Sequence, residues 1–206
     1  MSQQKPVINR RQNAINLIKA HNGWIRMSDA IKAGINRRTL YSLRDDGVIE
    51  PVSRGTYRLC GQHSLSEPDK AAVALRVPHA VICLVSALSF HEITTQIPGA
   101  VDIAVPFGAA APRISYPPVK VYKLREPSFS AGITEHLIDG VKVKIYDMEK
   151  TICDCFKFRR YLGMDVVLEA LKLYRERKPL RVSKLIEYAR ICRVEKIIRP
   201  YLEAIL

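Results

Sequence analysis

The chain has 206 residues, of which 48% are apolar and 26% are charged, and these shares are typical of a soluble globular protein. Its formal net charge of +13 favours an anionic partner, with nucleic acid first and a membrane surface second. The five cysteines include no CxxC pair and no Cys/His spacing suited to zinc, so we expect reduced thiols and no metal site.

The positive charge is concentrated at the two ends of the sequence. Residues 1–65 contain 11 Lys and Arg against 4 Asp and Glu, a net charge of +7. Residues 66–145 contain 8 against 7, and residues 146–206 contain 14 against 9, giving net charges of +1 and +5. The N-terminal sequence lacks the apolar core of a signal peptide, and the longest apolar run, 80–85, is too short to span a bilayer. We therefore expect a cytoplasmic protein with no membrane partner.

The first 60 residues predict a winged helix-turn-helix domain. Apolar residues at helical spacing predict three helices, over 9–21, 29–33 and 37–46. Ser28 and Asn36 are the predicted N-caps of the second and third helices, and a glycine follows each helix. Two short apolar runs around Ser53-Arg54-Gly55 predict a β-hairpin. We place the boundary of this domain in the polar stretch 61–67 and assign residues 1–64 to it.

Residues 65–206 predict a second domain that mixes strands and helices. Predicted strands lie at 100–105, 119–124, 133–138 and 141–146, with the turn Asp139-Gly140 joining the last two into a hairpin. Helices are predicted to start at Ser66-Glu67-Pro68-Asp69 and to cover 86–93, 148–160, 165–178, 183–193 and 195–206. The fold class we expect is α+β, with a small β-sheet packed by helices in the second domain.

The third helix carries side chains suited to DNA. At about 100° per residue, Leu40 and Leu43 fall on one face, and polar residues occupy the other. Arginine binds guanine bidentately, and hydroxyl groups reach base edges or phosphates. The predicted DNA-binding residues are Arg37, Arg38, Thr39, Tyr41, Ser42 and Arg44 on this helix, Arg54 at the hairpin tip, and Arg10 and Arg11 at the start of the first helix.

The N-terminal residues of a recognition helix penetrate deepest into the major groove, so Arg37, Arg38 and Ser42 rank above Arg44. Arg54 at the hairpin tip is suited to a backbone or minor-groove contact. The alternative is that the winged domain docks a protein and that its arginines form a solvated face.

The sequence resembles the AbiEi antitoxin family. The resemblance is carried by GWIRMSDAIKAGINRRTLYSLRDDGVIEPVSRGTYRL at 23–59, AVICLVSALSFHEIT at 80–94, VDIAVP at 101–106 and VKVKIYDMEKTICDCFKFR at 141–159. It extends from about residue 8 to 205. The resemblance implies an antitoxin of a bacterial type IV toxin–antitoxin pair, linked to abortive phage infection. It further implies that the winged domain represses its own operon at inverted or direct promoter repeats, and that the C-terminal domain counteracts a nucleotidyltransferase-like toxin. Type IV antitoxins act without a stable toxin complex, and the mode of neutralisation by this chain stays open.

Two alternatives stay open at this point. The first is a winged transcription regulator with an effector-binding C-terminal domain. The second is a winged metal-dependent nuclease, for which Asp102, Asp147, Glu149 and Lys150 offer the right residue types. Neither lysine of residues 141–146 has a carboxylate two positions before it, and Asp147 and Glu149 also suit the start of a helix. We therefore expect no catalytic residues, no enzymatic activity and no cofactor.

The C-terminal basic residues permit two interpretations. Cations at the C-terminal ends of helices are stabilised by the helix dipole, which accounts for some of them. Their number exceeds what capping needs, so a second anionic contact is the alternative, with flanking DNA or RNA as the partner. The residues in question are Lys157, Arg159, Arg160, Lys172 and Arg175.

Overall fold

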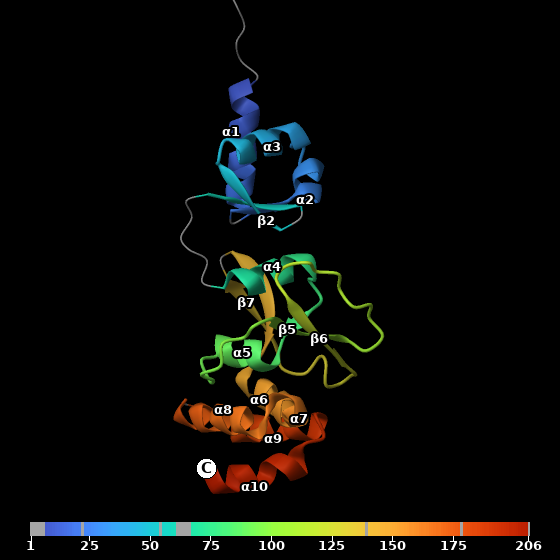
Figure 1. Ribbon diagram of the computed structural model, residues 1–206, viewed down its shortest axis with the longest axis vertical. Coiled ribbons are helices and arrows are strands. Elements are labelled where there is room, and N and C mark those ends of the chain that lie inside the picture. Colours follow the sequence, from blue (N-terminus) through green and yellow to red (C-terminus); the bar gives the residue numbers. More distant parts are fainter. Residues whose placement is uncertain are drawn as a thin grey trace, which may run out of the picture. The chain divides into compact units, whose positions relative to one another are not determined.

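The structure is a computed structural model that describes residues 7–21, 23–53, 55–60, 67–138, 140–177 and 179–205 (Figure 1). The chain divides into two compact units. The first unit comprises the described residues up to Ala72 together with Leu137–Lys142, and the second comprises Val73–His136 and the described residues from Val143 onward. The boundary predicted between residues 64 and 65 lies outside the described residues.

The first unit contains the predicted winged helix-turn-helix. We call residues 7–59 the winged segment. Its elements are α1 (Val7–Ala20), β1 (Trp24–Arg26), α2 (Met27–Lys32), α3 (Arg37–Asp45), β2 (Ile49–Ser53) and β3 (Thr56–Leu59). The strands form an antiparallel sheet in the order β1-β3-β2, so the predicted hairpin is flanked by a third strand from Trp24–Arg26.

Helix α3 is bounded by the residues that the sequence indicated. The side chain of Asn36 accepts a hydrogen bond from the backbone N–H of Arg38 at 2.9 Å, which satisfies one of the free donors of the first turn. Gly47, two residues past the helix end, has a φ of 67°, which glycine adopts without steric cost. Leu40 and Leu43 are completely buried and pack with Ala14 and Ile18 of α1.

The second helix departs from prediction at its start. Helix α2 begins at Met27, and its N-cap position is held by Arg26, which makes no side-chain capping hydrogen bond. Ser28 therefore lies inside the first turn, where its hydroxyl donates to Asp29 Oδ1 at 3.4 Å. The prediction failed because β1 runs directly into α2, which leaves no free residue between strand and helix to act as a cap.

The elements after the winged segment alternate between helices and strands before ending in a run of helices. They are α4 (Pro68–Arg76), β4 (Val81–Ile82), α5 (Leu84–Phe90), β5 (Val101–Pro106), β6 (Val119–Leu124), β7 (Ile133–Ile138), β8 (Val141–Tyr146), α6 (Met148–Lys157), α7 (Arg159–Leu162), α8 (Met164–Glu176), α9 (Val182–Ile191) and α10 (Glu195–Ile205). The predicted α+β class is confirmed. The helix expected over 148–160 breaks at Phe158, the one expected over 86–93 lies at Leu84–Phe90, and strand β4 was not predicted.

A five-stranded mixed sheet has the strand order β6-β5-β4-β8-β7. Strand β4 occupies its centre, antiparallel to β5 and parallel to β8, and β5 is parallel to β6. Helix α6 packs against α5, α8 and α9 (Figure 1). Its residues Glu149–Phe156 are all buried, so α6 is the central helix of the second unit rather than an amphipathic cover.

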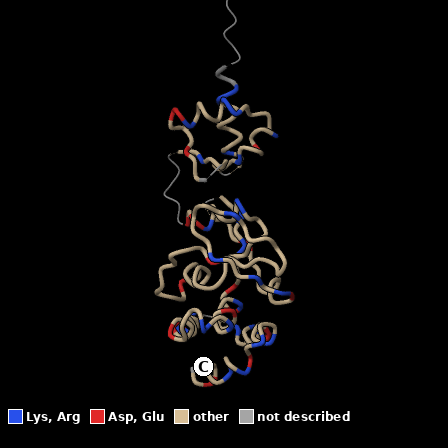
Figure 2. Tube along the Cα trace, turned by 45° about the vertical axis from the view of Figure 1, so that its right-hand side comes forward, with Lys and Arg blue, Asp and Glu red and all other residues tan. Residues whose placement is uncertain are grey.

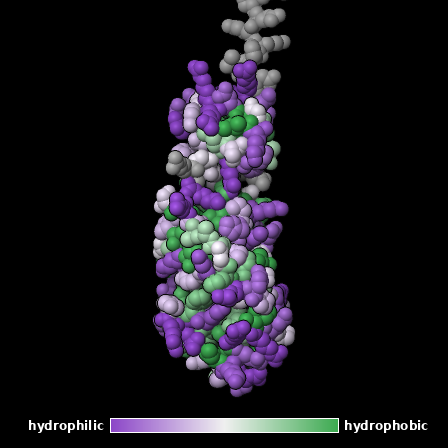
Figure 3. Space-filling model, turned by 90° about the vertical axis from the view of Figure 1, so that its right-hand side faces the viewer, coloured by the Kyte–Doolittle hydropathy of each residue, from purple (hydrophilic) through white to green (hydrophobic). Residues whose placement is uncertain are grey.

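The cysteines are divided between the two units. Cys60 is exposed and follows β3 in the first unit, whereas Cys83, Cys153, Cys155 and Cys192 are buried in the second unit and are free thiols. Burial raises the pKa of the Cys192 thiol to about 11. In the view of Figure 3, hydrophobic residues are scattered among hydrophilic ones on the surface of both units. Among the described residues, no helix combines the length and apolar character needed to cross a membrane.

Candidate nucleic-acid interface

Helix α3 presents a polar face opposite the buried pair Leu40 and Leu43. Of the six predicted DNA-binding residues on this helix, Thr39 is half-buried. The other five are exposed, and they are Arg37, Arg38, Tyr41, Ser42 and Arg44. The structure thus places all six on the helix that the sequence indicated. The antiparallel pair β2–β3 follows directly in the chain.

The positive charges near the C-terminal end of α3 are already neutralised. The guanidinium of Arg44 donates two hydrogen bonds to Asp45 Oδ1, at 2.9 and 2.7 Å, and lies over the Tyr41 ring at 5.0 Å. The hydrogen bond to Asp45 raises the pKa of Arg44. This local pairing is consistent with the lower rank that the sequence gave Arg44.

A second exposed acid, Asp46, binds two more of the predicted residues. Its Oδ2 atom lies 2.6 Å from Nη1 of Arg11 in α1 and accepts a hydrogen bond from the Ser42 hydroxyl at 3.2 Å. Arg11 and Ser42 are therefore engaged within the winged segment. An incoming phosphate or base would have to compete with Asp46 for both, which the sequence pattern alone did not indicate.

Three predicted arginines keep uncompensated charge. They are Arg10, Arg37 and Arg38. All three are exposed, and within the described residues none of them forms an ion pair with an acid. Arg37 and Arg38 stand on the first turn of α3, and Arg10 stands near the start of α1, whose basic end is blue in Figure 2. Unpaired positive charge therefore lies at the N-terminal end of α3, the end predicted to penetrate deepest into the major groove. Arg54 lies outside the described residues.

The second set of predicted basic residues does not form one cluster. Arg160 is exposed on α7, and Lys172 and Arg175 are exposed on α8. Lys157 and Arg159, in contrast, line a cleft of about 550 Å³ in the second unit, together with Lys123, Arg125 and Arg193. Sequence reasoning missed these last three because they come from β6, from the segment after β6, and from the turn between α9 and α10, with no local pattern to connect them.

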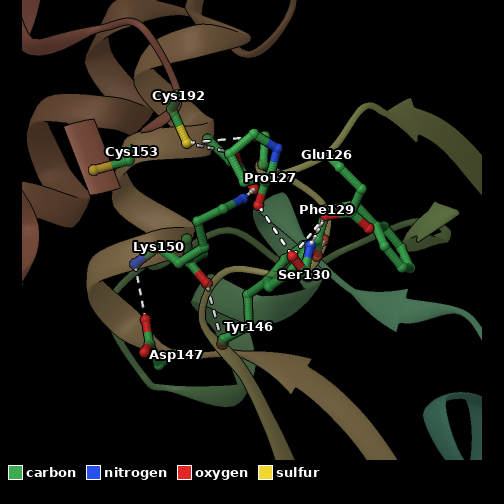
Figure 4. Close-up of polar contacts among 12 residues, drawn as sticks. Glu126, Pro127, Phe129, Ser130, Tyr146, Asp147, Lys150, Cys153 and Cys192 are labelled. Atoms are coloured by element: carbon green, nitrogen blue, oxygen red, sulfur yellow. Dashed lines mark hydrogen bonds and ion pairs between the residues drawn. The ribbon is translucent and has the colours of Figure 1, made fainter. Parts of the chain in front are cut away.

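The carboxylates considered for a nuclease are each held in structural hydrogen bonds. Asp147 caps α6 by accepting from the backbone N–H of Lys150 at 2.9 Å (Figure 4). Its other oxygen accepts from the Tyr188 hydroxyl at 3.0 Å and lies 2.8 Å from Lys184 Nζ. Glu149 accepts from the Tyr174 hydroxyl at 3.0 Å. Across the described ranges, no three His, Cys, Asp or Glu side chains are grouped so that they could hold a metal ion.

Asp102 lies apart from these groups on β5. It accepts hydrogen bonds from the backbone N–H of Ser86 at 3.3 Å and from the Tyr122 hydroxyl at 3.4 Å. Burial raises the pKa of Asp102. Its partners come from α5 and β6, so its visible role is to tie both elements to the strand between them.

Comparisons with known proteins agree with the winged segment. Residues 14–59 match the family model described as transcriptional regulator, AbiEi antitoxin. This stretch is similar to AbiEi antitoxins. The resemblance inferred from the sequence is thereby confirmed for these residues, which make up less than a quarter of the chain. No match was found among curated proteins.

One solved structure shows that the likeness in fold extends beyond the AbiEi-type segment. The crystal structure of the RV2827C protein from Mycobacterium tuberculosis superimposes with a TM-score of 0.53 at 15% sequence identity, and the match covers 90% of this chain and 73% of that chain. At this identity the likeness concerns the fold alone. It places the second unit, as well as the winged segment, within a known architecture.

Proposed function

We propose that the protein binds its own promoter through the winged segment and represses its operon as an antitoxin. The observation that carries this proposal is the exposed, uncompensated pair Arg37 and Arg38 on the first turn of α3. A helix of this kind enters the major groove with its N-terminal residues against the base edges. The hairpin tip with Arg54 and the start of α1 with Arg10 then contact the flanking backbone.

The division of charge on α3 refines which residues determine specificity. Arg37 and Arg38 are the expected base contacts, because no acid of the described residues pairs with either. Thr39 and Tyr41 provide the adjoining polar contacts. Arg11 links α1 to the end of α3 through Asp46, and Arg44 is paired with its neighbour Asp45. Pure protein docking, the competing interpretation of the winged segment, predicts no preference for one DNA sequence over another.

The test is a mobility-shift titration on DNA from upstream of the gene, against unrelated DNA of equal length, over a salt series. Selective binding is expected, with the affinity falling steeply as salt increases because phosphate contacts release counterions. Arg38→Ala should cost about 1–3 kcal/mol of binding free energy and relax the preference at one base pair. Arg10→Ala should weaken binding to all sequences alike and reduce the salt slope by about one.

Lys19→Ala is the matched control, because it also removes one exposed positive charge from the winged segment. Lys19 stands in the last turn of α1, nine residues and so about 14 Å along the helix from Arg10. Its loss should leave sequence preference unchanged. Equal effects of Lys19→Ala and Arg38→Ala, or equal affinity for all DNA, would move the arginines of α3 to a solvated face.

We further propose that residues 65–206 supply the antitoxin activity, by counteracting a nucleotidyltransferase-like toxin encoded beside this gene. The AbiEi-type match of the winged segment and the resemblance of the later motifs support this assignment. The existence of the toxin is inferred from that resemblance alone, as are its substrate and any contact with it. Growth rescue on co-expression with the neighbouring gene product tests the proposal directly.

A further inference from the structure

The cleft in the second unit has the size of a small-molecule site. Its volume of about 550 Å³ falls within the range of roughly 300–1,000 Å³ found for ligand pockets. Its walls come from the segment after β5, the end of β6, the junction of α6 and α7, and the turn between α9 and α10. Every one of these segments belongs to the second unit, so the cleft is independent of the winged segment.

The charge lining the cleft is positive and unbalanced. The five cations are Lys123, Arg125, Lys157, Arg159 and Arg193, and Glu126 is the acid among the described residues that line it. Within the part of the chain that the structure describes, none of the five cations forms an ion pair. The Glu126 carboxylate accepts from the backbone N–H and hydroxyl of Ser130, at 3.2 and 2.6 Å. A cleft lined by charges of one sign concentrates ions of the opposite sign, here anions.

The cleft also carries a flat stacking surface. The Phe107 side chain is 55% exposed, and its backbone N–H donates to Leu124 O at 2.7 Å, which fixes the residue beside the end of β6. The guanidinium carbon of Arg125 lies 3.7 Å from the centre of the Phe107 ring. A ring paired with a guanidinium plane is the kind of surface on which nucleic-acid bases stack. An inorganic anion has no ring that could stack on this surface.

Arg193 occupies a backbone position that favours glycine. Its φ is 60°, and it directly follows the C-cap Cys192 of α9, where the backbone N–H of Val194 returns to Ala189 O at 2.8 Å. Glycine is the usual residue at this helix-ending position because it has no Cβ to clash. Residues held in this backbone region cluster at functional sites, and Arg193 lines the cleft.

The floor of the cleft is neutral and buried. Ser128 and Cys192 lie there, with Ser128 Oγ and Cys192 Sγ 3.7 Å apart. Figure 4 shows Cys192 directed toward the chain segment that contains Pro127 and Ser130. The Cys192 thiol donates to Asp154 Oδ1 at 3.4 Å, and Asp154 is in turn paired with Lys150 at 2.5 Å. The cleft therefore joins a cationic rim, an aromatic surface and a neutral floor.

We propose that this cleft binds a nucleotide, with its phosphates among the five cations and its base on the Phe107–Arg125 stack. Two sources share this chemistry, a free nucleoside triphosphate and a nucleotide at the end of single-stranded RNA. Lys157 and Arg159, which the sequence indicated as an anionic contact, are thereby assigned to this ligand rather than to flanking DNA.

The first experiment is calorimetric titration of the full-length protein with ATP, with tripolyphosphate, which has phosphates but no base, and with adenosine, which has no phosphate. ATP should bind about tenfold more tightly than tripolyphosphate, the difference being the contribution of one stacked base. Adenosine should bind more weakly than either, because it lacks the charge-assisted hydrogen bonds.

Two variants separate the parts of the site. Phe107→Ala should lower ATP affinity about tenfold and leave tripolyphosphate unchanged. Arg193→Gly should lower the affinity for both by about tenfold, while its melting temperature equals or exceeds that of the wild type, because glycine relieves the strained backbone. Because Arg193→Gly should not reduce stability, a loss of affinity in this variant can be assigned to the cleft even if other substitutions impair folding. Lys172→Ala, an exposed charge on α8 outside the cleft, is the matched control and should change neither affinity.

An eight-nucleotide fluorescein-labelled single-stranded RNA distinguishes the two sources, measured by anisotropy in an Arg37→Ala, Arg38→Ala background that silences the winged segment. RNA binding that is tighter than ATP binding and sensitive to Phe107→Ala supports a strand end, and the reverse order supports a free nucleotide. Equal affinity for ATP and tripolyphosphate, or no effect of Phe107→Ala on ATP, would overturn the proposal and leave nonspecific anion attraction.

Discussion

Lys150 and Asp154 form an ion pair that is entirely removed from solvent. Their side chains are 0% and 1% exposed, and Nζ lies 2.5 Å from Oδ2. Lys150 Nζ also lies 4.1 Å from the centre of the Tyr146 ring, and the Cys192 thiol donates to Asp154 Oδ1 at 3.4 Å. Burial raises the pKa of Asp154. A buried pair of this kind contributes little net stability, but either partner alone is costly because an uncompensated charge remains.

We accordingly predict that Asp154→Leu lowers the free energy of unfolding by about 3–5 kcal/mol, as measured by urea denaturation. The double variant Lys150→Met, Asp154→Leu should recover most of that loss, since no charge is then left unpaired. A double variant as unstable as Asp154→Leu would show that packing rather than charge dominates at this position.

His91 gives a second prediction for a single residue, through pH. Its Nε2 lies 2.7 Å from Tyr146 O, and burial, followed by the nearby His136, lowers its pKa below the ordinary value. The unfolded chain therefore binds this proton more readily than the folded one. The contribution of His91 is complete above its unfolded pKa of about 6.5 and is lost as pH falls through the lower folded pKa.

The variant His91→Gln retains a hydrogen-bond donor for Tyr146 O but does not titrate. Between pH 7.5 and pH 5.5 the wild type should lose more unfolding free energy than this variant, as followed by urea denaturation at each pH. In this comparison, the contribution of the carboxylates to the pH dependence of the unfolding free energy cancels, because both proteins share them. Equal losses would mean that His91 keeps its ordinary pKa.

At the scale of elements, the first turn of α3 depends on its cap. Asn36 accepts from the backbone N–H of Arg38, and Arg38 is also an expected base contact, so the cap and the DNA contact share one turn. Asn36→Ala should destabilise the protein by about 1 kcal/mol and weaken promoter binding although no charge changes. Asn36→Ser, which can still cap, should retain most of both. Thermal unfolding and the mobility shift together measure the two effects.

The winged elements were predictable because their signals are local. Asn36, the pair Leu40 and Leu43, and Gly47 define α3 within a dozen residues. Strand β4 gave no comparable signal, since Val81–Ile82 is two residues long and exists only because β5 and β8 pair on either side of it. The break between α6 and α7 at Phe158 likewise depends on packing within the second unit, where its ring meets Tyr122 edge-on.

At the scale of the whole molecule, the same distinction separates the two candidate sites. The polar face of α3 could be predicted because it occupies one helix. The cleft could not, because its cations are separated by up to 70 positions in sequence, from Lys123 to Arg193, and meet only when the second unit folds. The pairing of Arg11 with Asp46 was hidden for the same reason.

Because the proposed DNA contacts lie in the first unit, the two proposed activities should be separable. Arg37→Ala with Arg38→Ala should abolish repression of a promoter reporter while leaving growth rescue on toxin co-expression intact. A folded 65–206 fragment should likewise rescue growth without repressing the reporter. A full-length double variant that loses both activities while keeping its melting temperature would assign toxin neutralisation to the winged segment as well.

The distribution of cysteines allows local opening of the protein to be measured by thiol alkylation. An alkylating reagent reaches Cys60 in the native protein, whereas the four buried thiols of the second unit are shielded by packing and by raised pKa values. Mass spectrometry after timed alkylation would therefore measure the opening of the second unit separately from the winged segment. Labelling of Cys192, on the cleft floor, would follow how tightly the cleft is closed in the presence of a ligand.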